Sequence, residues 1–402
     1  MVEYMENKVL KPKIRFKGFT GTWEQRKLNE VISEYKETVD SGCDLPILTS
    51  SKSEGVVLQE EHFGRIQNHD ITGYNILPLN YCTYRNRSDG VDFTFNINKR
   101  CNKGIISKFY PVFTGKNSDI FFISLELNHS KEIIHEISYT CTGTGQKVLS
   151  FLDLQKMNIK IPSYNEQHKI GQLFEKIDNL ITLHQSKYDK LVNVKKALLE
   201  KMFPKDGKNV PEIRFKGFTD TWEQRKLEGI YKFQYGEFNN NPSNGGIYPV
   251  YGANGIIGGY TNYNAENSVI IGHMGEYAGS VLWGNGKHFV TYNGTISKPR
   301  GENVVSKFGY YMLYQKDINK ICGGSGLPFL SYEQLNKIEV CYPKDIKEQK
   351  SIANYLTNID NLITLHQHKC FLKFDNNINI ELLGNSVNLM MYILSRKECR
   401  LK

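Results

Sequence analysis

Residues 166–203 are the longest stretch of this sequence able to form one continuous helix, and they limit the fold more than any other segment. The stretch reads EQHKIGQLFEKIDNLITLHQSKYDKLVNVKKALLEKMF, with no proline and a single glycine. Apolar residues recur in steps of three and four, the pattern of a narrow helical seam close to a heptad repeat. At ~1.5 Å per residue the helix is roughly 55 Å long. Such a helix is too long for the interior of one ordinary domain, and its narrow seam needs a partner helix.

The chain supplies the partner by repeating itself. Residues 359–367 read IDNLITLHQ, identical to residues 177–185. We therefore expect two long helices packed on each other. The predicted seam residues are Ile170, Phe174, Ile177, Ile181, His184, Leu191, Leu198, Ile352, Ile359, Ile363 and His366. The two histidines are interpreted as packed polar residues, because no Cys/His spacing indicates a zinc site.

A second repeat precedes each helix by a long interval. Residues 14–28 read IRFKGFTGTWEQRKL and residues 213–227 read IRFKGFTDTWEQRKL, so the two leaders differ only at Gly21 and Asp220. Between leader and helix, the two bodies diverge. The repeated leader and helix thus form a common frame around two dissimilar bodies. This arrangement suits a protein that recognises two different targets at a fixed separation.

The bodies carry the patterns of curved β-sheets with a few helices. Runs such as Gly104–Ile106 and Ile120–Leu127 predict strands, and residues 130–138 predict a helix. The second body is richer still in strand and turn patterns. A Gly-Thr-Gly turn followed by Leu-Ser in residues 143–150 is echoed by Gly-Ser-Gly and Leu-Ser in residues 324–331.

These patterns predict an α+β fold with two mixed bodies and two long helices. The expected domains are residues 1–163, the first long helix at 164–204, the second body at 205–346, and the second helix with a tail at 347–402. After Lys369 the sequence departs from the first helix, and Asn376, Asn377 and Gly384 weaken helix propensity. We expect the second helix to be regular to about residue 369 and irregular beyond it.

Composition narrows the class of protein. The chain has 40% hydrophobic and 23% charged residues, which is ordinary for a globular protein, and no apolar run approaches the length of a membrane span. Its eight cysteines are scattered and never form C-x-x-C, so we expect them to be reduced and the protein to be cytoplasmic. A net charge of +9 mildly favours a polyanionic partner.

No catalytic machinery is recognisable. A methyltransferase needs a glycine-rich cofactor loop and an [DN]PP[YF] motif, and the nearest string, at Asn241-Pro242, lacks the second proline and the aromatic residue. A phosphate-binding G-x-x-x-x-G-K-[ST] loop is absent. Glu348-x-Lys350 resembles part of a nuclease site, but an acidic residue that stabilises a helix N-terminus explains it better. We predict no catalytic residue, no metal site and no cofactor bound by this chain.

What remains is binding. Asn and Arg match the edges of adenine and guanine in the major groove, while Lys more often neutralises phosphates. Glycine-rich turns can also bring backbone N–H groups close to phosphates. For each single residue, an ordinary solvated surface is an equally good explanation. The candidate DNA-binding residues are Arg85, Asn86, Arg87, Lys99, Arg100, Lys103, Lys108, Thr144, Gln146, Lys147, Tyr251, Asn254, His273, Lys287, Lys298, Arg300 and Ser325.

The layout resembles the specificity subunit of type I restriction–modification enzymes. The resemblance rests on the duplicated TWEQRKL leaders (22–28 and 221–227) and the duplicated EQ-to-LHQ helices (166–185 and 348–367), and it covers about residues 12–369. It implies two target-recognition domains separated by an antiparallel, coiled-coil pair of helices with pseudo-two-fold symmetry. Each domain would read one half of a split, asymmetric site in double-stranded DNA, with the helices acting as a ruler.

The resemblance also implies partners. Two modification (methyltransferase) subunits and restriction (motor–nuclease) subunits would assemble with the chain, and S-adenosylmethionine, ATP and Mg would be bound by those subunits. Two alternatives stay open. One is a self-sufficient methyltransferase or nuclease, which would need a cofactor site. The other is a coiled-coil scaffold without DNA affinity, against which the divergent bodies and the positive charge argue weakly.

Overall fold

The structure is a computed structural model that describes residues 15–40, 42–65, 70–205, 207–238, 243–323 and 327–372, with side chains to residue 367. The described residues divide into two compact units, one that ends at Ile181 and one that begins at Thr182. The division falls inside the long helix α6, Tyr164–Met202, so each half of this helix belongs to one unit. Most of the atypical tail after Lys369 lies outside the described residues.

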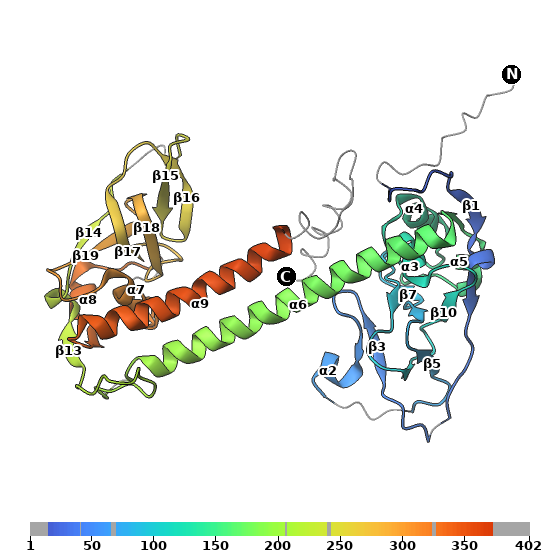
Figure 1. Cartoon of the computed structure of the whole chain (residues 1–402), viewed down its shortest axis with the longest axis horizontal. Coiled ribbons are helices and arrows are strands. Elements are labelled where there is room, and N and C mark those ends of the chain that lie inside the picture. Colours follow the sequence, from blue (N-terminus) through green and yellow to red (C-terminus); the bar gives the residue numbers. More distant parts are fainter. Residues whose placement is uncertain are drawn as a thin grey trace. The chain divides into compact units, whose positions relative to one another are not determined.

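Unit 1 contains the first body and the first half of α6 (Figure 1). Its strands are β1 (Glu24–Lys27), β2 (Ile32–Glu34), β3 (Leu48–Ser51), β4 (Gly55–Leu58), β5 (Asn75–Pro78), β6 (Cys82–Thr83), β7 (Arg87–Ser88), β8 (Asn96–Ile97), β9 (Lys103–Ile106), β10 (Val112–Gly115), β11 (Lys147–Val148) and β12 (Asn158–Ile161). Its shorter helices are α1 (Leu28–Val31), α2 (Gln59–Phe63), α3 (Ile120–His129), α4 (Lys131–Thr140) and α5 (Phe151–Lys156). The largest sheet has the strand order β2-β10-β6-β8, and the other strands form two-stranded ladders.

One predicted strand in unit 1 is a helix. Residues 120–127 open α3, where the Asp119 side chain caps the first turn by accepting hydrogen bonds from the N–H groups of Phe121 and Phe122. Six of the ten residues of the helix are apolar, and Phe122, Ile123 and Leu127 are buried in the core of the first body. A helix buried on most of its surface shows no period in sequence, so its apolar run looks like a buried strand. The helix predicted at residues 130–138 is confirmed as α4.

Unit 2 is built on one six-stranded sheet with the order β14-β19-β17-β18-β15-β16. Its strands are β13 (Glu223–Lys226), β14 (Tyr231–Tyr235), β15 (Tyr248–Gly252), β16 (Gly255–Tyr260), β17 (Ala265–Gly272), β18 (Val281–Val290), β19 (Gly294–Pro299) and β20 (Glu339–Tyr342). Its helices, besides the second half of α6, are η1 (Leu227–Gly229), α7 (Ser306–Tyr314), η2 (Ile318–Ile321), α8 (Tyr332–Lys337) and α9 (Ile346–Leu372). Neighbouring strands pair antiparallel except β15 and β18, which pair parallel. The predicted mixed helical and β class is confirmed.

The repeated leaders and helix starts build the same anchor in both units. Strand β1 pairs antiparallel with β12, and β13 pairs with β20, so each leader is joined to the strand just before its long helix. Arg15 donates two hydrogen bonds to the buried Glu166 carboxylate, and Arg214 does the same to Glu348. This anchor explains why the leader and the EQ pair are repeated together although they lie far apart in sequence.

The glutamine of each EQ pair completes the anchor. Gln167 accepts a hydrogen bond from the Asp119 N–H and donates one to the Pro162 carbonyl. Gln349 accepts from the Val305 N–H and donates to the Pro343 carbonyl. Each glutamine therefore joins the long helix to the residue before the first turn of a body helix, where backbone N–H groups lack intrahelical partners.

Within unit 2, α9 lies antiparallel beside the second half of α6 (Figure 1). His184 Nδ1 lies 3.0 Å from His366 Nδ1, and Lys195 Nζ lies 2.6 Å from Asp360 Oδ1. The α9 positions fall in number as the α6 positions rise, which fixes the antiparallel direction. His184 is buried against its repeat-equivalent, in line with the interpretation of the two histidines as packed polar residues.

Three predicted seam residues pack against the core of a body. Ile170 packs against the core of the first body, and Ile352 belongs to the core of the second body. Both lie in the first turns of their helices, where the anchors hold the helix on its body, so the helix–helix seam starts later than the sequence pattern indicates. Leu198 also packs against the second core. No helix in the described parts of the chain has the length and apolar character to cross a membrane.

Candidate nucleic-acid interface

In unit 1, a hairpin brings separate candidate residues to one place. Thr142 and Val148 exchange backbone hydrogen bonds of 3.2 and 2.9 Å, closing a turn that contains Thr144 and Gln146. Strand β11 of this hairpin pairs with β7, with Val148 opposite Arg87. The hairpin residues predicted to bind DNA therefore lie beside the Arg85–Arg87 segment, as β-pairing requires.

The turn depends on a glycine. Gly143 has a φ of +101°, and a Cβ atom added there would lie 2.3 Å from the Gln146 carbonyl oxygen. A side chain is excluded by both the backbone conformation and the close approach. The glycine therefore holds the turn tight, and Thr144 and Gln146 are exposed at its tip.

Cations surround this hairpin. Arg85 and Arg87 are exposed on either side of Asn86, and the Arg87 guanidinium lies 4.5 Å from the ring centroid of the half-exposed Phe109. Lys108 Nζ lies 5.9 Å from the same ring. The Asn86 N–H donates to the Phe109 carbonyl at 2.9 Å, which keeps the two segments together. We call Arg85, Arg87, Lys108, Phe109 and the 142–148 turn the cationic surface; exposed positive charge of this kind attracts phosphates.

The corresponding region of unit 2 is aromatic. Gly323 and Phe329 exchange backbone hydrogen bonds of 3.0 and 2.9 Å just before α8. The His273 ring packs against Phe329 and Tyr292, with ring centroids 4.8 and 5.4 Å away, and against Tyr235 at 3.9 Å. His273 is fully buried, whereas Phe329 and Tyr292 are about two-fifths exposed at 40% and 42%. Burial lowers the pKa of His273, which favours its neutral form.

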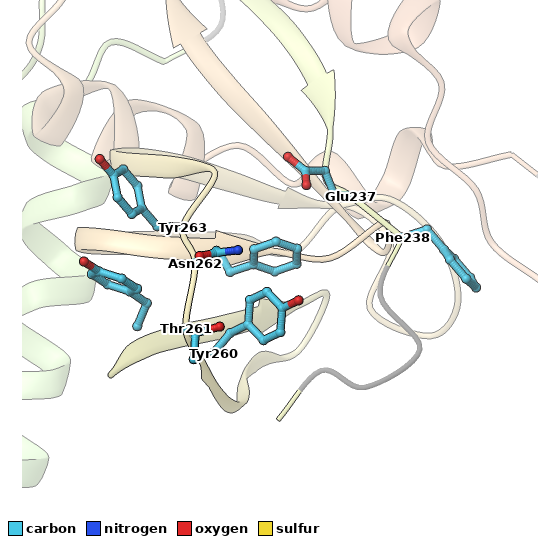
Figure 2. Close-up of a pocket in the computed structure, with 8 residues that line it drawn as sticks. Glu237, Phe238, Tyr260, Thr261, Asn262 and Tyr263 are labelled. Carbon is cyan, nitrogen blue, oxygen red and sulfur yellow. The ribbon is translucent and has the colours of Figure 1, made fainter. Parts of the chain in front are cut away.

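A second feature of unit 2 is an open hollow of about 630 Å³ beside the β15–β16 hairpin. It is lined by Glu237, Phe238, Tyr248, Tyr260, Thr261, Asn262, Tyr263 and Phe289. Figure 2 shows Glu237 and Tyr263 on one side of Asn262, Tyr260 and Thr261 on the other, and the Phe238 ring turned outward. Lys287 Nζ lies 4.5 Å from the Tyr263 ring centroid, so the hollow has a cation at its margin. Planar rings, hydroxyls and a cation suit stacking against a base or contact with a phosphate.

Comparison with known proteins identifies the family. The family described as Type I restriction modification DNA specificity domain matches residues 21–193 and 219–370, one copy for each repeat of the frame. The chain belongs to the type I restriction–modification specificity subunits. It is 23% identical over 306 residues to the type I restriction enzyme MjaVIII specificity subunit of Methanocaldococcus jannaschii, covering 65% of this chain and 69% of that protein.

A solved structure shares the fold of this specificity subunit. The crystal structure of the type I restriction–modification system S subunit from M. genitalium matches with a TM-score of 0.67 at 16% identity, covering 96% of this chain and 97% of that one. At this identity the likeness concerns the fold alone.

Not every candidate residue of the specificity subunit joins the cationic surface. Lys99 forms an ion pair with Glu175 of α6 and lies over the Phe121 ring, and Arg100 forms an ion pair with Glu61. These charges are partly neutralised, so Lys99 and Arg100 are weaker candidates for DNA contact than the sequence indicated. Lys103 is exposed on β9.

The candidates of the second body are also divided. Tyr251 is a buried core residue packed against His288, so its prediction as a surface contact is wrong. Asn254 is exposed at the β15–β16 turn, and Lys298 is exposed with its ammonium 2.7 Å from Gln234 Oε1. Arg300 is exposed but donates to the Tyr231 carbonyl at 3.1 Å. Ser325 lies outside the described residues.

Sequence reasoning missed the aromatic contributors. Phe109, Phe329 and the rings of the hollow were not among the candidates, because single aromatic residues usually belong to a core. One signal was available: tyrosines recur at 248, 251, 260 and 263 within a turn-rich segment. In the parts of the chain that the structure describes, no group of three or more His, Cys, Asp and Glu side chains is placed to hold a metal ion.

Proposed function

We propose that this specificity subunit supplies the DNA target of a type I restriction–modification complex and catalyses no reaction itself. Each unit reads one half of a bipartite, asymmetric site in double-stranded DNA. The observation that carries the proposal is the contrast between identical anchors and unlike surfaces. The same Arg–Glu–Gln anchor holds a cationic surface in unit 1 and an aromatic one in unit 2, which suits two domains that read different sequences.

The long helices are proposed to set the distance between the half-sites. Helix α6 has 39 residues and takes part in both units. At ~1.5 Å per residue it spans roughly 58 Å, enough to bridge readers placed one or more turns of B-DNA apart. The buried anchors at the starts of α6 and α9 fix each helix to its own body. A change in helix length should therefore change the distance between the two reading surfaces.

The exposed faces of the helices are proposed to receive the modification subunits. Leu180 and Leu183 are each 48% exposed on α6, and their repeat-equivalents Leu362 and Leu365 are 43% and 41% exposed on α9. Apolar side chains exposed at equivalent places of a repeat suit two copies of one partner. Restriction subunits would join this assembly. S-adenosylmethionine, ATP and Mg are expected on those partners, with none held by this chain.

The test is methylation mapping of a complex assembled with its modification subunit. The wild-type complex should methylate adenines in one bipartite sequence with a fixed unread gap. Four residues inserted after Ile181, where the two units divide, should shift the readers by roughly 6 Å and lengthen the gap by about two base pairs. An unchanged gap would contradict the spacing role. Methyl transfer by the isolated chain would instead support the alternative, a self-sufficient enzyme.

A further inference from the structure

Asn86 and His273 occupy the same place in two bodies that share no sequence around them. In unit 1 the reciprocal pair Thr142–Val148 closes the turn, and the next residue, Leu149, donates its N–H to the Asn86 carbonyl at 3.0 Å. In unit 2 the reciprocal pair Gly323–Phe329 is followed by Leu330, which donates to the His273 carbonyl at 2.9 Å. Both Leu residues precede a serine that caps a six-residue helix, α5 or α8.

The other backbone group of each residue is also used alike. The Asn86 N–H donates to the Phe109 carbonyl, and the His273 N–H donates to the Asn293 carbonyl at 2.8 Å. Each residue is therefore held between a neighbouring loop and the segment that leads to the capped helix. This equivalence is a property of the hydrogen-bond pattern and is invisible in the sequence.

Both side chains also keep a buried acceptor atom without a hydrogen-bond partner in the described part of the chain. Asn86 Oδ1 and His273 Nε2 are among the few buried side-chain polar atoms that have no hydrogen-bond partner among the described residues. His273 Nδ1 lies 3.0 Å from the Leu330 carbonyl oxygen, which can only accept, so the ring proton is on Nδ1 and Nε2 carries a lone pair. Unpaired buried acceptors destabilise a fold, so their presence at matching places needs an explanation other than packing.

The two acceptors lie next to surfaces suited to nucleic acid. Asn86 is partly exposed between the arginines of the cationic surface. His273 lies one side-chain layer below the surface, covered by the rings of Phe329 and Tyr292, which are themselves exposed. Neither acceptor atom is open to solvent, so contact with a base edge requires the Asn86 amide to turn outward and one of the rings that cover His273 to rotate away. The donors that a base presents in the major groove are the exocyclic amines of adenine and cytosine.

We propose that Asn86 and His273 are equivalent specificity-determining residues, each accepting a hydrogen bond from an adenine or cytosine amine in the half-site of its own unit. This rests on the proposed function, because it requires that each unit reads one half-site. It goes beyond that function by naming one residue in each unit and the chemical group that the residue recognises.

The test uses the complete chain assembled with its modification subunit, with methylated adenines mapped genome-wide. Asn86→Ala removes the acceptor in unit 1. His273→Asn keeps an amide donor near the Leu330 carbonyl but has no atom at the place of Nε2, whereas His273→Gln restores a polar atom there. Asn86→Ala should raise methylation of sites altered at one base pair of one half-site by about tenfold. His273→Asn should raise methylation only of sites altered in the half-site read by unit 2. His273→Gln should retain the wild-type sequence preference.

Each variant controls for the other, because correct reading of the opposite half-site shows that the subunit is folded and assembled. The inference is overturned if the Asn86→Ala complex keeps the wild-type sequence, if both variants relax the same half-site, or if methylation falls with no new sequence accepted. A wild-type complex that methylates no bipartite sequence would instead refute the proposed function, whatever the variants do.

Discussion

Replacement of Arg214 by methionine should destabilise unit 2 strongly and leave unit 1 almost unchanged. The Arg214 and Glu348 side chains are 13% and 2% exposed, and two hydrogen bonds of 2.7 and 2.8 Å join them. Methionine fills much of the volume but leaves the Glu348 carboxylate buried, with only the 3.3 Å hydrogen bond from Trp222 Nε1. Breaking a buried ion pair on one side costs ~3–5 kcal/mol.

The effect should be visible as a shift in melting temperature and in local exchange. Because the Arg214 side chain is not wholly buried, we take the lower end of the range, about 3 kcal/mol. For a unit of this size that corresponds to a fall of roughly 6–12 °C in Tm. Hydrogen–deuterium exchange read by mass spectrometry should show faster exchange in peptides of the second body and α9. Peptides from residues 15–163 should exchange as in the wild type.

Two variants separate the anchor from general effects of charge. Arg225→Met removes an exposed arginine of the same leader, paired with Glu223 on the surface, and should change stability little. Arg214→Met combined with Glu348→Leu removes both buried charges and should recover part of the loss. The reasoning is refuted if Arg214→Met is as harmless as Arg225→Met, or if exchange rises equally in both units.

Three further outcomes follow. Arg87→Ala should lower the slope of log K against log salt for DNA binding by about 1. Arg100→Ala removes a charge that is already paired with Glu61 and should change the slope less. Equal changes in the two variants would contradict a role of the cationic surface in DNA binding. Burial lowers the pKa of Lys307 to about 8, so the unfolded chain binds more protons than the folded one between about pH 8 and 10.5. After allowance for solvent screening, the free energy of unfolding measured by urea titration should therefore rise by about 1 kcal/mol across that pH window. Lys307→Met should abolish the rise. Leu362→Ser should reduce co-purification of the modification subunit without lowering Tm, and undiminished capture would exclude this face as the docking surface.

Local periodicity explains the features that could be predicted from the sequence. The helix at residues 166–203 and its partner were predictable because an amphipathic helix shows its buried face as a repeat of apolar residues. The contact between His184 and His366 followed from their identical places in the repeat. By contrast, α3 was mistaken for a strand, since burial on most sides leaves its sequence without a period.

The candidate site was predictable only in part, because charge in a sequence carries no information about its partner. Arg85, Arg87 and Lys108 are exposed cations, but nothing local in the sequence distinguishes them from Arg100, whose partner Glu61 comes from a distant helix. Tyr251 lies in a turn-rich segment and is nevertheless buried, since its side chain belongs to a core cluster with Ile270 and Val290 of other strands.

The sequence by itself determined that the chain has two copies of one frame around two unlike bodies, because identical letters at matching places must form the same local structure. Tertiary structure alone decided how the repeated residues act. It placed Arg15 on Glu166 and Arg214 on Glu348 from opposite ends of each repeat. It also placed Asn86 and His273 in the same backbone environment. Hydrogen bonds between segments that are distant in sequence depend on the tertiary fold. The residues next to each partner in the sequence show no pattern that indicates which distant segment it will meet.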